Sequence, residues 1–285
     1  MNKFTQTLIA IVTLLASCNN SLEFKTLPSG VEYCYINQNP DSTTANPGDV
    51  WIINVKYYNS NDSLLFNSKE VAENFTMGCP EEEMQGCIEE GLTKIHKGDS
   101  MIIKVDAEKF YNISCATTPP DFIKKGEQLT FYVKCENIIA KEDFENQLLE
   151  LENRMVAQEK MLIRSYLERE GIQAKHFDNG IYKIILKEGQ GKETAANKFV
   201  NVNYVGTFLD GLEFDNSYKR GKPLKFQLGQ NLVIQGWEFA IATMKKGEKS
   251  QFIIPFRLAY GAKGQKGIIP PYCTLLFEIE LLDFK

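Results

Sequence analysis

The chain is poor in histidine and has no excess of positive charge. Its 285 residues include two histidines, His96 and His176, and its seven cysteines form no CxxC motif. These absences argue against a zinc site. The net charge of −5 argues against general nucleic-acid binding, which requires a cationic surface. Hydrophobic residues make up 43% of the chain, which is enough for packed cores, and the length suits about two domains.

The apolar run near the N-terminus is too short to span a bilayer. LIAIVTLLA at Leu8–Ala16 has nine residues, which fits the core of a signal peptide. The sequence that ends it, Leu15–Cys18, resembles the bacterial lipobox. We predict a signal peptide over residues 1–17, lipidation of Cys18 and a tether over residues 18–24. The alternative is an ordinary signal peptide cut near this point.

Lipidation would place the rest of the protein outside the cytoplasm, because acyl chains on Cys18 insert into a membrane surface. We expect a bacterial membrane, with the outer membrane favoured and the protein on its periplasmic or surface side.

Five cysteines lie in the first half of the chain after Cys18: Cys34, Cys79, Cys87, Cys115 and Cys135. An exported chain can form disulfides, so we predict one or two bridges among these five. Their connectivity cannot be read from spacing. Buried free thiols are the alternative.

The chain contains an internal repeat. Val233–Glu248 reads VIQGWEFAIATMKKGE, and Glu83–Asp99 reads EMQGCIEEGLTKIHKGD. Three further pairs of segments match in the same order, about 150 residues apart: Pro28–Tyr33 with Asp178–Lys183, Val50–Ser68 with Phe199–Ser217, and Leu129–Ile138 with Leu275–Phe284. A repeat of this period indicates two copies of one domain.

Each copy is predominantly strand. In LFEIELL the residues Phe277, Ile279 and Leu281 share one face, which is typical of a strand. A short amphipathic helix is predicted between Gly236 and Gly247. We therefore predict an α+β fold, in which two antiparallel sheets, each with one short helix packed on it, are joined by a long helix.

The long helix is predicted from Lys141–Glu170, which contains neither proline nor glycine. Apolar residues at three- and four-residue spacing form its stripe: Phe144, Leu148, Leu151, Met155, Leu162 and Tyr166. We favour a linker helix packed on its own domains. A dimer formed through the Phe144–Tyr166 stripe is the alternative, although Gln158 and Ser165 interrupt that stripe.

The second copy carries a set of motifs in one order. These are Tyr204-Val-Gly, Asp210-Gly, Glu213-Phe-Asp-Asn-Ser217, Lys225-Phe-Gln-Leu-Gly229, Val233-Ile-Gln-Gly-Trp237, Met244-Lys-Lys-Gly247, Leu258-Ala-Tyr-Gly-Ala262 and Gly267-Ile-Ile-Pro-Pro271. Together they resemble an FKBP-type peptidyl-prolyl cis–trans isomerase domain. With its lipobox, the chain also resembles FKBP-type lipoproteins of Bacteroidetes. The expected domains are a degenerate FKBP-like domain over 25–140, a helical linker over 141–174 and an isomerase domain over 175–285.

The resemblance implies rotation about X–Pro peptide bonds, whose barrier is about 18–20 kcal/mol. The barrier is lost amide resonance, so a dry pocket that favours the twisted amide can catalyse the reaction. No proton is transferred and no bond breaks. The chemistry therefore calls for no metal or cofactor.

The same resemblance assigns the site residues. The implied catalytic residues are Tyr204, Phe214, Asp215, Trp237 and Tyr260. The implied substrate-binding residues are Val233, Ile234, Phe226, Ile268, Ile269, Phe277 and Arg220. Trp237 would form the pocket floor, and the backbone N–H of Ile234 would bind a substrate carbonyl. Asp215 would lie at the rim, bonded to Tyr204 or Arg220. Core packing is the alternative for Phe226 and Phe277.

The first copy lacks most of these residues. Its tryptophan position falls on Cys87 or Ile88, its Phe–Asp pair reads Phe66–Asn67, and Tyr57 is matched to Tyr204. We predict that it keeps the fold without the isomerase site. It would bind client chains, set a distance from the membrane or dimerise.

The predicted function is that of a peptidyl-prolyl isomerase that assists folding of exported proteins at a bacterial membrane surface. Its partners would be proline-containing polypeptides, with FK506- or rapamycin-like macrolides as further candidate ligands. The alternative is a non-catalytic assembly lipoprotein that uses the fold as a peptide clamp.

Overall fold

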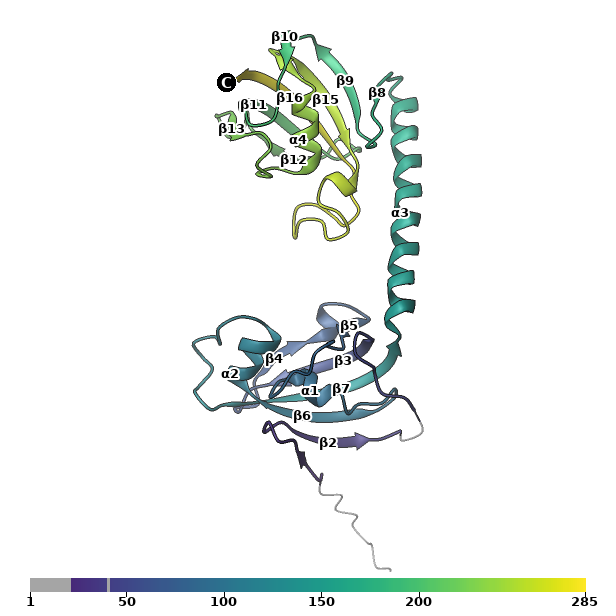
Figure 1. Ribbon diagram of the computed structural model, residues 1–285, viewed down its shortest axis with the longest axis vertical. Coiled ribbons are helices and arrows are strands. Elements are labelled where there is room, and N and C mark those ends of the chain that lie inside the picture. The colour runs from purple at the N-terminus through teal and green to yellow at the C-terminus, as the bar shows by residue number, and fades with distance from the viewer. Residues whose placement is uncertain (1–21, 40–41) are drawn as a thin grey trace, which may run out of the picture. The chain divides into compact units, whose positions relative to one another are not determined.

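The computed structural model describes residues 22–39 and 42–285 (Figure 1). The predicted signal peptide, Cys18 and part of the tether lie outside the described residues. The chain divides into two compact units, Met1–Gln147 and Leu148–Lys285, and the boundary falls inside the long helix α3 (Lys141–Arg169). Among the helices that the structure describes, none combines the length and the apolar character needed to cross a membrane.

The first unit contains one seven-stranded antiparallel sheet in the order β1-β2-β6-β7-β3-β4, with β5 also paired to β3. Its strands are β1 (Lys25–Thr26), β2 (Glu32–Asn37), β3 (Val50–Tyr58), β4 (Leu64–Asn67), β5 (Phe75–Gly78), β6 (Ser100–Asp106) and β7 (Gln128–Ile139). Its helical segments are η1 (Ser68–Glu70), α1 (Ile88–Leu92), α2 (Ala107–Lys109) and η2 (Phe110–Ser114). Alternate residues of β3 and β7 are buried, as expected for strands with one face on a core.

The second unit repeats this sheet in the order β8-β9-β15-β16-β11-β12, with β13 also paired to β11. Its strands are β8 (Lys175–His176), β9 (Tyr182–Lys187), β11 (Phe199–Thr207), β12 (Glu213–Asn216), β13 (Leu224–Gln227), β15 (Lys249–Ile254) and β16 (Leu275–Phe284). β10 (Gln190–Glu193) pairs with β14 (Lys245–Lys246), and the helical segments besides α3 are α4 (Gln235–Ala242) and η3 (Phe256–Leu258). The predicted fold class is confirmed, because both units show the same antiparallel sheet with a short helix.

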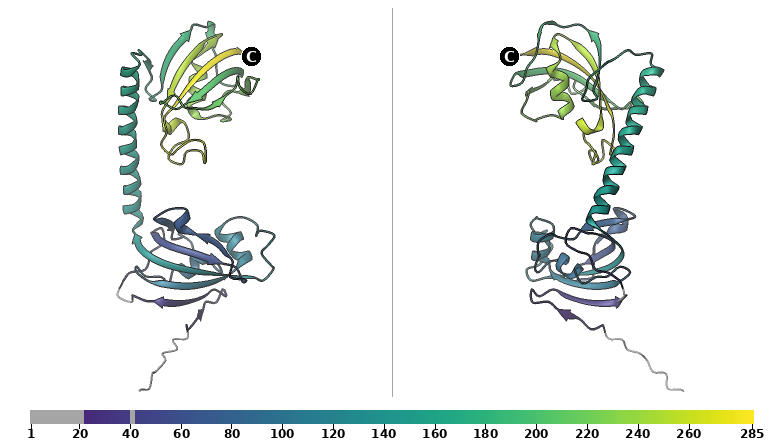
Figure 2. Two further views of the ribbon diagram at one scale, coloured as in Figure 1. Left: turned by 180° about the vertical axis from the view of Figure 1, so that it is seen from behind. Right: turned by 45° about the vertical axis from the view of Figure 1, so that its right-hand side comes forward.

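Two helices cover opposite faces of the second sheet. α4 lies across one face (Figure 2), where Trp237 packs in the same core as Phe252. The other face carries Ile253, which follows Phe252 and therefore points the opposite way. Ile163 of α3 is 3% exposed and packs there with Ile253 and Leu276. The part of α3 in this unit is thus a component of its fold.

The helix itself was predicted correctly, but its packing stripe only in part: Tyr166 packs in the cluster that contains Ile163, whereas two other members do not pack. Leu148 and Leu162, both in the predicted stripe, are 48% and 61% exposed. The buried residues of α3 are Glu159 and Ile163. The spacing of apolar residues did not predict this buried face of α3, because the charged residue Glu159 lies at its centre.

The predicted disulfides are wrong for the described residues, in which all six cysteines are free: Cys34, Cys79, Cys87, Cys115, Cys135 and Cys273. Cys34 of β2 is opposite Ile102 of β6, which is opposite Tyr132 of β7. Cys135 lies three residues beyond Tyr132 on β7, so its Cα atom is more than two strand spacings, about 9.6 Å, from that of Cys34, whereas a disulfide requires Cα atoms within about 7 Å. Burial raises the pKa of the Cys87 and Cys135 thiols to about 11, so both stay protonated.

Candidate active site

Five aromatic rings from five different elements meet on the inner side of the second sheet. Trp237, in the first turn of α4, is 4% exposed. Its ring centroid lies 4.7 Å from that of Tyr204 on β11 and 5.2 Å from that of Phe277 on β16, both edge to face. Phe214 on β12 lies 5.5 Å from Phe277, and Phe226 on β13 lies 6.3 Å from Trp237. The predicted floor and walls are therefore in mutual contact.

Gly206 makes room for two of these rings. A Cβ atom at this position would lie 2.8 Å from ring atoms of both Phe214 and Phe277, closer than side chains can pack. Gly206 was not among the predicted site residues. Its signal is present in the Tyr204-Val-Gly motif, where the glycine follows the wall residue by two positions and so shares its face.

A polar network lies beside the rings. The Tyr204 hydroxyl donates to Asp215 Oδ2 at 2.6 Å, and Arg220 donates both to Asp215 Oδ1 and to the Tyr204 hydroxyl. Burial, followed by the hydrogen bond to the Asp215 carboxylate, raises the pKa of Tyr204 to about 12, while Arg220 opposes the shift. Tyr204 therefore stays a neutral hydrogen-bond donor over the physiological pH range. The predicted bonds of Asp215 to Tyr204 and Arg220 are both present.

The segment before α4 presents a backbone donor. Ile234 is the residue that precedes the first turn of α4, and within the described residues its N–H has no acceptor. Val233 and Ile234 are both half-buried against the core that contains Trp237. Glu238 fixes this segment by accepting the N–H groups of Gly229 at 2.6 Å and Asn231 at 3.1 Å. Glu238 is a supporting residue that sequence analysis did not find.

The long loop between β15 and β16 carries the remaining predicted residues. Tyr260 is 36% exposed, and burial followed by the negative charge of Asp215 raises its pKa. Ile268 and Ile269 were both expected to cover the substrate, but the structure separates them. Ile268 is 51% exposed, whereas Ile269 is 4% exposed and packs in the core.

The first unit has a different residue at each equivalent register position. The N–H of Val55 donates to Ser68 Oγ as that of Tyr204 donates to Ser217 Oγ, so Val55 occupies the Tyr204 position. Tyr57 was matched to Tyr204 in the sequence, and this match is wrong. Tyr57 pairs with Phe131 as Gly206 pairs with Phe277, so a tyrosine stands where the second unit has its glycine.

The first unit also differs at the positions equivalent to Asp215 and Trp237. Phe66 pairs with Tyr57 as Asp215 pairs with Gly206, so a ring replaces the rim carboxylate. Ile88 precedes Gly98 by the same number of residues as Trp237 precedes Gly247, which decides between Cys87 and Ile88 in favour of Ile88.

The Tyr57 ring fills the space that these replacements leave. Its centroid lies 4.8 Å from that of Phe131, 5.2 Å from that of Phe110 and 5.6 Å from that of Phe66. Rings at these distances are in van der Waals contact. The first unit thus has a packed aromatic core where the second unit has the candidate site.

Comparisons with known proteins match the second unit to one family. The family model of FKBP-type peptidyl-prolyl cis-trans isomerase matches residues 191–282, which include every predicted catalytic and substrate-binding residue. FK506-binding protein 1 of Dictyostelium discoideum is 45% identical over 106 residues, which are 37% of this chain and 99% of that protein.

A second relative extends beyond this unit. FkpA of Buchnera aphidicola, an FKBP-type peptidyl-prolyl cis-trans isomerase by name, is 36% identical over 165 residues, 58% of this chain and 59% of that protein. Among solved structures, FkpA from Escherichia coli shares 37% identity over 52% of this chain and 74% of that chain, with a TM-score of 0.41.

Proposed function

Because the chain belongs to the family of FKBP-type peptidyl-prolyl cis-trans isomerases, we propose that its second unit catalyses rotation about X–Pro bonds at the aromatic cluster. The observation that carries this proposal is the contact of Trp237 with Tyr204 and Phe277, flanked by the Asp215 network and the unpaired N–H of Ile234. These groups supply an apolar surface for a proline ring and donors for the carbonyl groups around it.

In this mechanism the groups hold a twisted amide more tightly than a planar one. Trp237 lies under the proline ring, and Tyr204, Phe214 and Phe277 form the walls. The Ile234 N–H binds a substrate carbonyl and so fixes the chain beside the rotating bond. Exclusion of water favours the twisted amide, because it is less charge-separated than the planar form. Each 1.36 kcal/mol removed from the barrier gives a tenfold rate increase.

Residues on the long loop and at the rim complete the proposed site. Tyr260 donates its hydroxyl to the substrate, and its raised pKa keeps that proton in place. Asp215 faces the rotating carbonyl, and Arg220 holds the Asp215 carboxylate in position. Of the two isoleucines, Ile268 is the exposed one and therefore covers the substrate, whereas Ile269 supports the loop from the core.

We further propose that the first unit has no isomerase site of its own. Tyr57 occupies the space of a proline pocket there, and Ile88 and Phe66 replace the floor and the rim carboxylate. Its role would be to bind client chains or to hold the second unit away from a membrane. FkpA of Buchnera aphidicola matches more of this chain than the catalytic unit alone, which supports a two-part arrangement.

The cellular setting is also a proposal. The lipobox resemblance supports lipidation of Cys18 and anchoring at a bacterial membrane, where the protein would assist folding of exported proline-containing chains. A labelled fatty acid should be incorporated into the wild-type chain and not into a Cys18→Ser variant. Label in both proteins would exclude Cys18 as the anchor.

The catalytic proposal is tested with short Leu-Pro and Phe-Pro peptides. The chain beginning at Asn19 should accelerate cis–trans exchange, and a Trp237→Ala, Asp215→Ala double variant that still folds should lose most of this activity. A macrolide should inhibit the wild type, as the names of the FK506-binding relatives suggest. Peptide binding without turnover by the folded wild type would show that the site is a clamp instead of an enzyme.

A further inference from the structure

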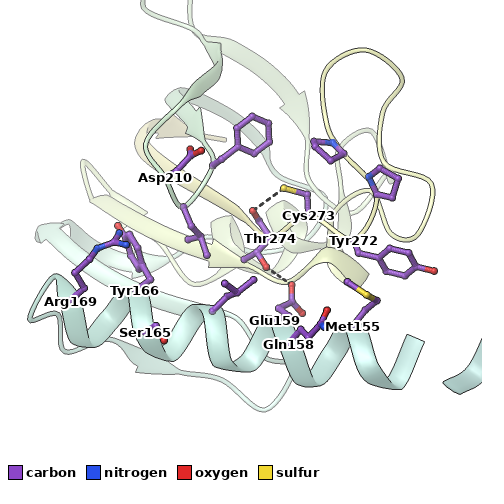
Figure 3. A pocket seen from close by; sticks show the side chains of 15 residues that line it. Met155, Gln158, Glu159, Ser165, Tyr166, Arg169, Asp210, Tyr272, Cys273 and Thr274 are labelled. Carbon is purple, nitrogen blue, oxygen red and sulfur yellow. Dashed lines mark hydrogen bonds between the residues drawn. The ribbon is translucent and has the colours of Figure 1, made fainter. Parts of the chain in front are cut away.

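A buried carboxylate of α3 contacts both ends of the loop that carries Tyr260. Glu159 is 6% exposed, and its Oε1 accepts the backbone N–H of Phe256 at 2.7 Å and the hydroxyl of Thr274 at 2.6 Å. Phe256 lies just after β15, and Thr274 lies just before β16. Figure 3 shows Glu159 pointing from α3 toward Thr274. One oxygen atom therefore joins the two ends of the loop.

Phe256 is in turn hydrogen-bonded to the backbone on both sides of Tyr260. The carbonyl of Phe256 accepts the N–H groups of Ala259 at 3.0 Å and Gly261 at 2.8 Å, the residues on either side of Tyr260. The carbonyl of Gly261 accepts the N–H of Tyr272 at 3.0 Å, and the Tyr272 ring lies 5.2 Å from that of Phe256. The backbone at Tyr260 is thus tied to Phe256 on both sides.

The helix provides a fixed support for Glu159. Ile163 is one helical turn further along the same face and is buried against Ile253 and Leu276. Next to Glu159, in contrast, an open pocket of about 470 Å³ lies between the helix and the loop base, lined in part by Met155 and Tyr272 (Figure 3). Apolar packing is incomplete at this place, so the two hydrogen bonds carry much of the connection between helix and loop.

We propose that Glu159 is a positioning residue for the isomerase reaction, which places Tyr260 at the site through Phe256 and Thr274. This inference rests on the proposed function of the second unit. It makes α3 part of the catalytic unit, because the helix that enters the unit also holds the loop that contacts the substrate. Glu159 itself lies on the opposite side of the sheet from Trp237 and does not touch the substrate.

The test compares the wild type with Glu159→Leu and Glu159→Gln in the whole chain. Leucine accepts no hydrogen bond, whereas the glutamine Oε1 can accept both bonds without a charge. Glu159→Leu should lower kcat/KM for a Leu-Pro peptide on the order of tenfold, since small displacements of positioning groups cost up to about a hundredfold. Glu159→Gln should keep kcat/KM near the wild-type value.

Glu152→Leu is the matched control. Glu152 is on the same helix and binds Arg257, the residue after Phe256, at 2.9 Å, but both side chains are more than 40% exposed. An exposed ion pair contributes little, so this variant should behave like the wild type. Hydrogen exchange at the Phe256 amide gives a second measure, and it should become faster in Glu159→Leu but not in the other two variants.

The possible outcomes separate the two proposals. Wild-type protein without turnover overturns the proposed function, and the positioning role with it. If the wild type turns over and Glu159→Leu is equally active, the positioning role alone is overturned. The same holds if Glu159→Gln loses as much activity as Glu159→Leu. If Glu159→Leu does not fold, Thr274→Val replaces it, because it removes one of the two bonds with little change in volume. That variant should lower kcat/KM severalfold, and unchanged kcat/KM would count against the proposal.

Discussion

Substitution of Gly206 by alanine should disturb two walls of the proposed pocket directly. The added Cβ would lie 2.8 Å from ring atoms of Phe214 and Phe277, whereas carbon atoms pack best about 3.5–4.0 Å apart. The φ angle of Gly206 is outside the left-handed region, so the backbone itself tolerates alanine. The whole effect must therefore come from displacement of the two rings.

The size of the effect follows from the overlap. Overpacking of a filled core costs about 1–3 kcal/mol, so the free energy of unfolding of the second unit should fall by that amount. Because the displaced rings are the proposed pocket walls, kcat/KM should fall on the order of tenfold or more. Both proteins carry Trp51→Phe, so that Trp237 is their single tryptophan. Urea unfolding, followed by Trp237 fluorescence, and peptide isomerisation then measure the two quantities on one preparation.

Gly78→Ala is the control for this experiment. Gly78 also lies in a strand, β5 of the first unit, and a Cβ there would meet no atom within 4 Å. Its stability should change by less than about 0.5 kcal/mol, and its turnover should not change. Destabilised Gly206→Ala with full turnover would falsify the assignment of Phe214 and Phe277 as pocket walls. Unchanged stability would show that the rings move freely and that Gly206 does not define the space between them.

Three further perturbations follow from buried groups. Glu248→Gln should lower the free energy of unfolding by about 3–5 kcal/mol, because it leaves Lys183 buried without the carboxylate 2.8 Å away. Burial raises the pKa of Glu248, but hydrogen bonds from Lys183, Ser250 and the backbone outweigh it and leave the pKa lowered. This contribution is thus present above pH ~4.3 and lost as pH falls through the folded pKa, and the acid limb of the urea titration should flatten in the variant. Burial raises the pKa of Glu159 in the folded protein. The stability of the wild type relative to Glu159→Gln should therefore be greatest at low pH and decline as pH rises through the folded-state pKa of Glu159. Tyr57→Ala should lower the stability of the first unit on the order of 2 kcal/mol and leave isomerase turnover unchanged; reduced turnover would mean that the first unit contributes to catalysis.

The sheets and the aromatic site could be predicted because their signals are local. Strand alternation can be read within a short segment, and the repeat can be read from pairs of short matching segments. The family motifs placed Trp237, Tyr204 and Phe277 in separate elements that meet in the fold. The match between the copies failed at Tyr57, where the repeat needed a gap of about one residue. The structure places Val55, not Tyr57, at the Tyr204 position, so the error was two residues along the strand. A shift of two residues keeps the same face, so the ring was correctly expected on the core side but at the wrong position along the strand.

The disulfide prediction failed for a related reason. Composition and compartment can indicate that cysteines are able to pair, but only the strand order decides whether they meet. The strand β6 lies between β2 and β7 in the sheet, although it follows β2 by more than sixty residues in sequence, and it keeps Cys34 and Cys135 apart. Burial then makes these thiols part of the apolar core.

The two units show that the sheet and the pocket are specified by different residues. Both copies keep the alternating apolar positions that bury one face of the sheet, and both therefore reach the same strand order. The proposed pocket depends instead on the missing side chain at Gly206. The proposed placement of Tyr260 beside it depends on Glu159, which lies outside the repeat in the joining helix. Placing a tyrosine at the equivalent position gains aromatic packing in the first unit and removes the space for a proline ring. The first unit also lacks a preceding helix with a buried carboxylate among its described residues. The first copy can therefore keep its fold without a proline pocket, since the residues that fill the equivalent space contribute to its core.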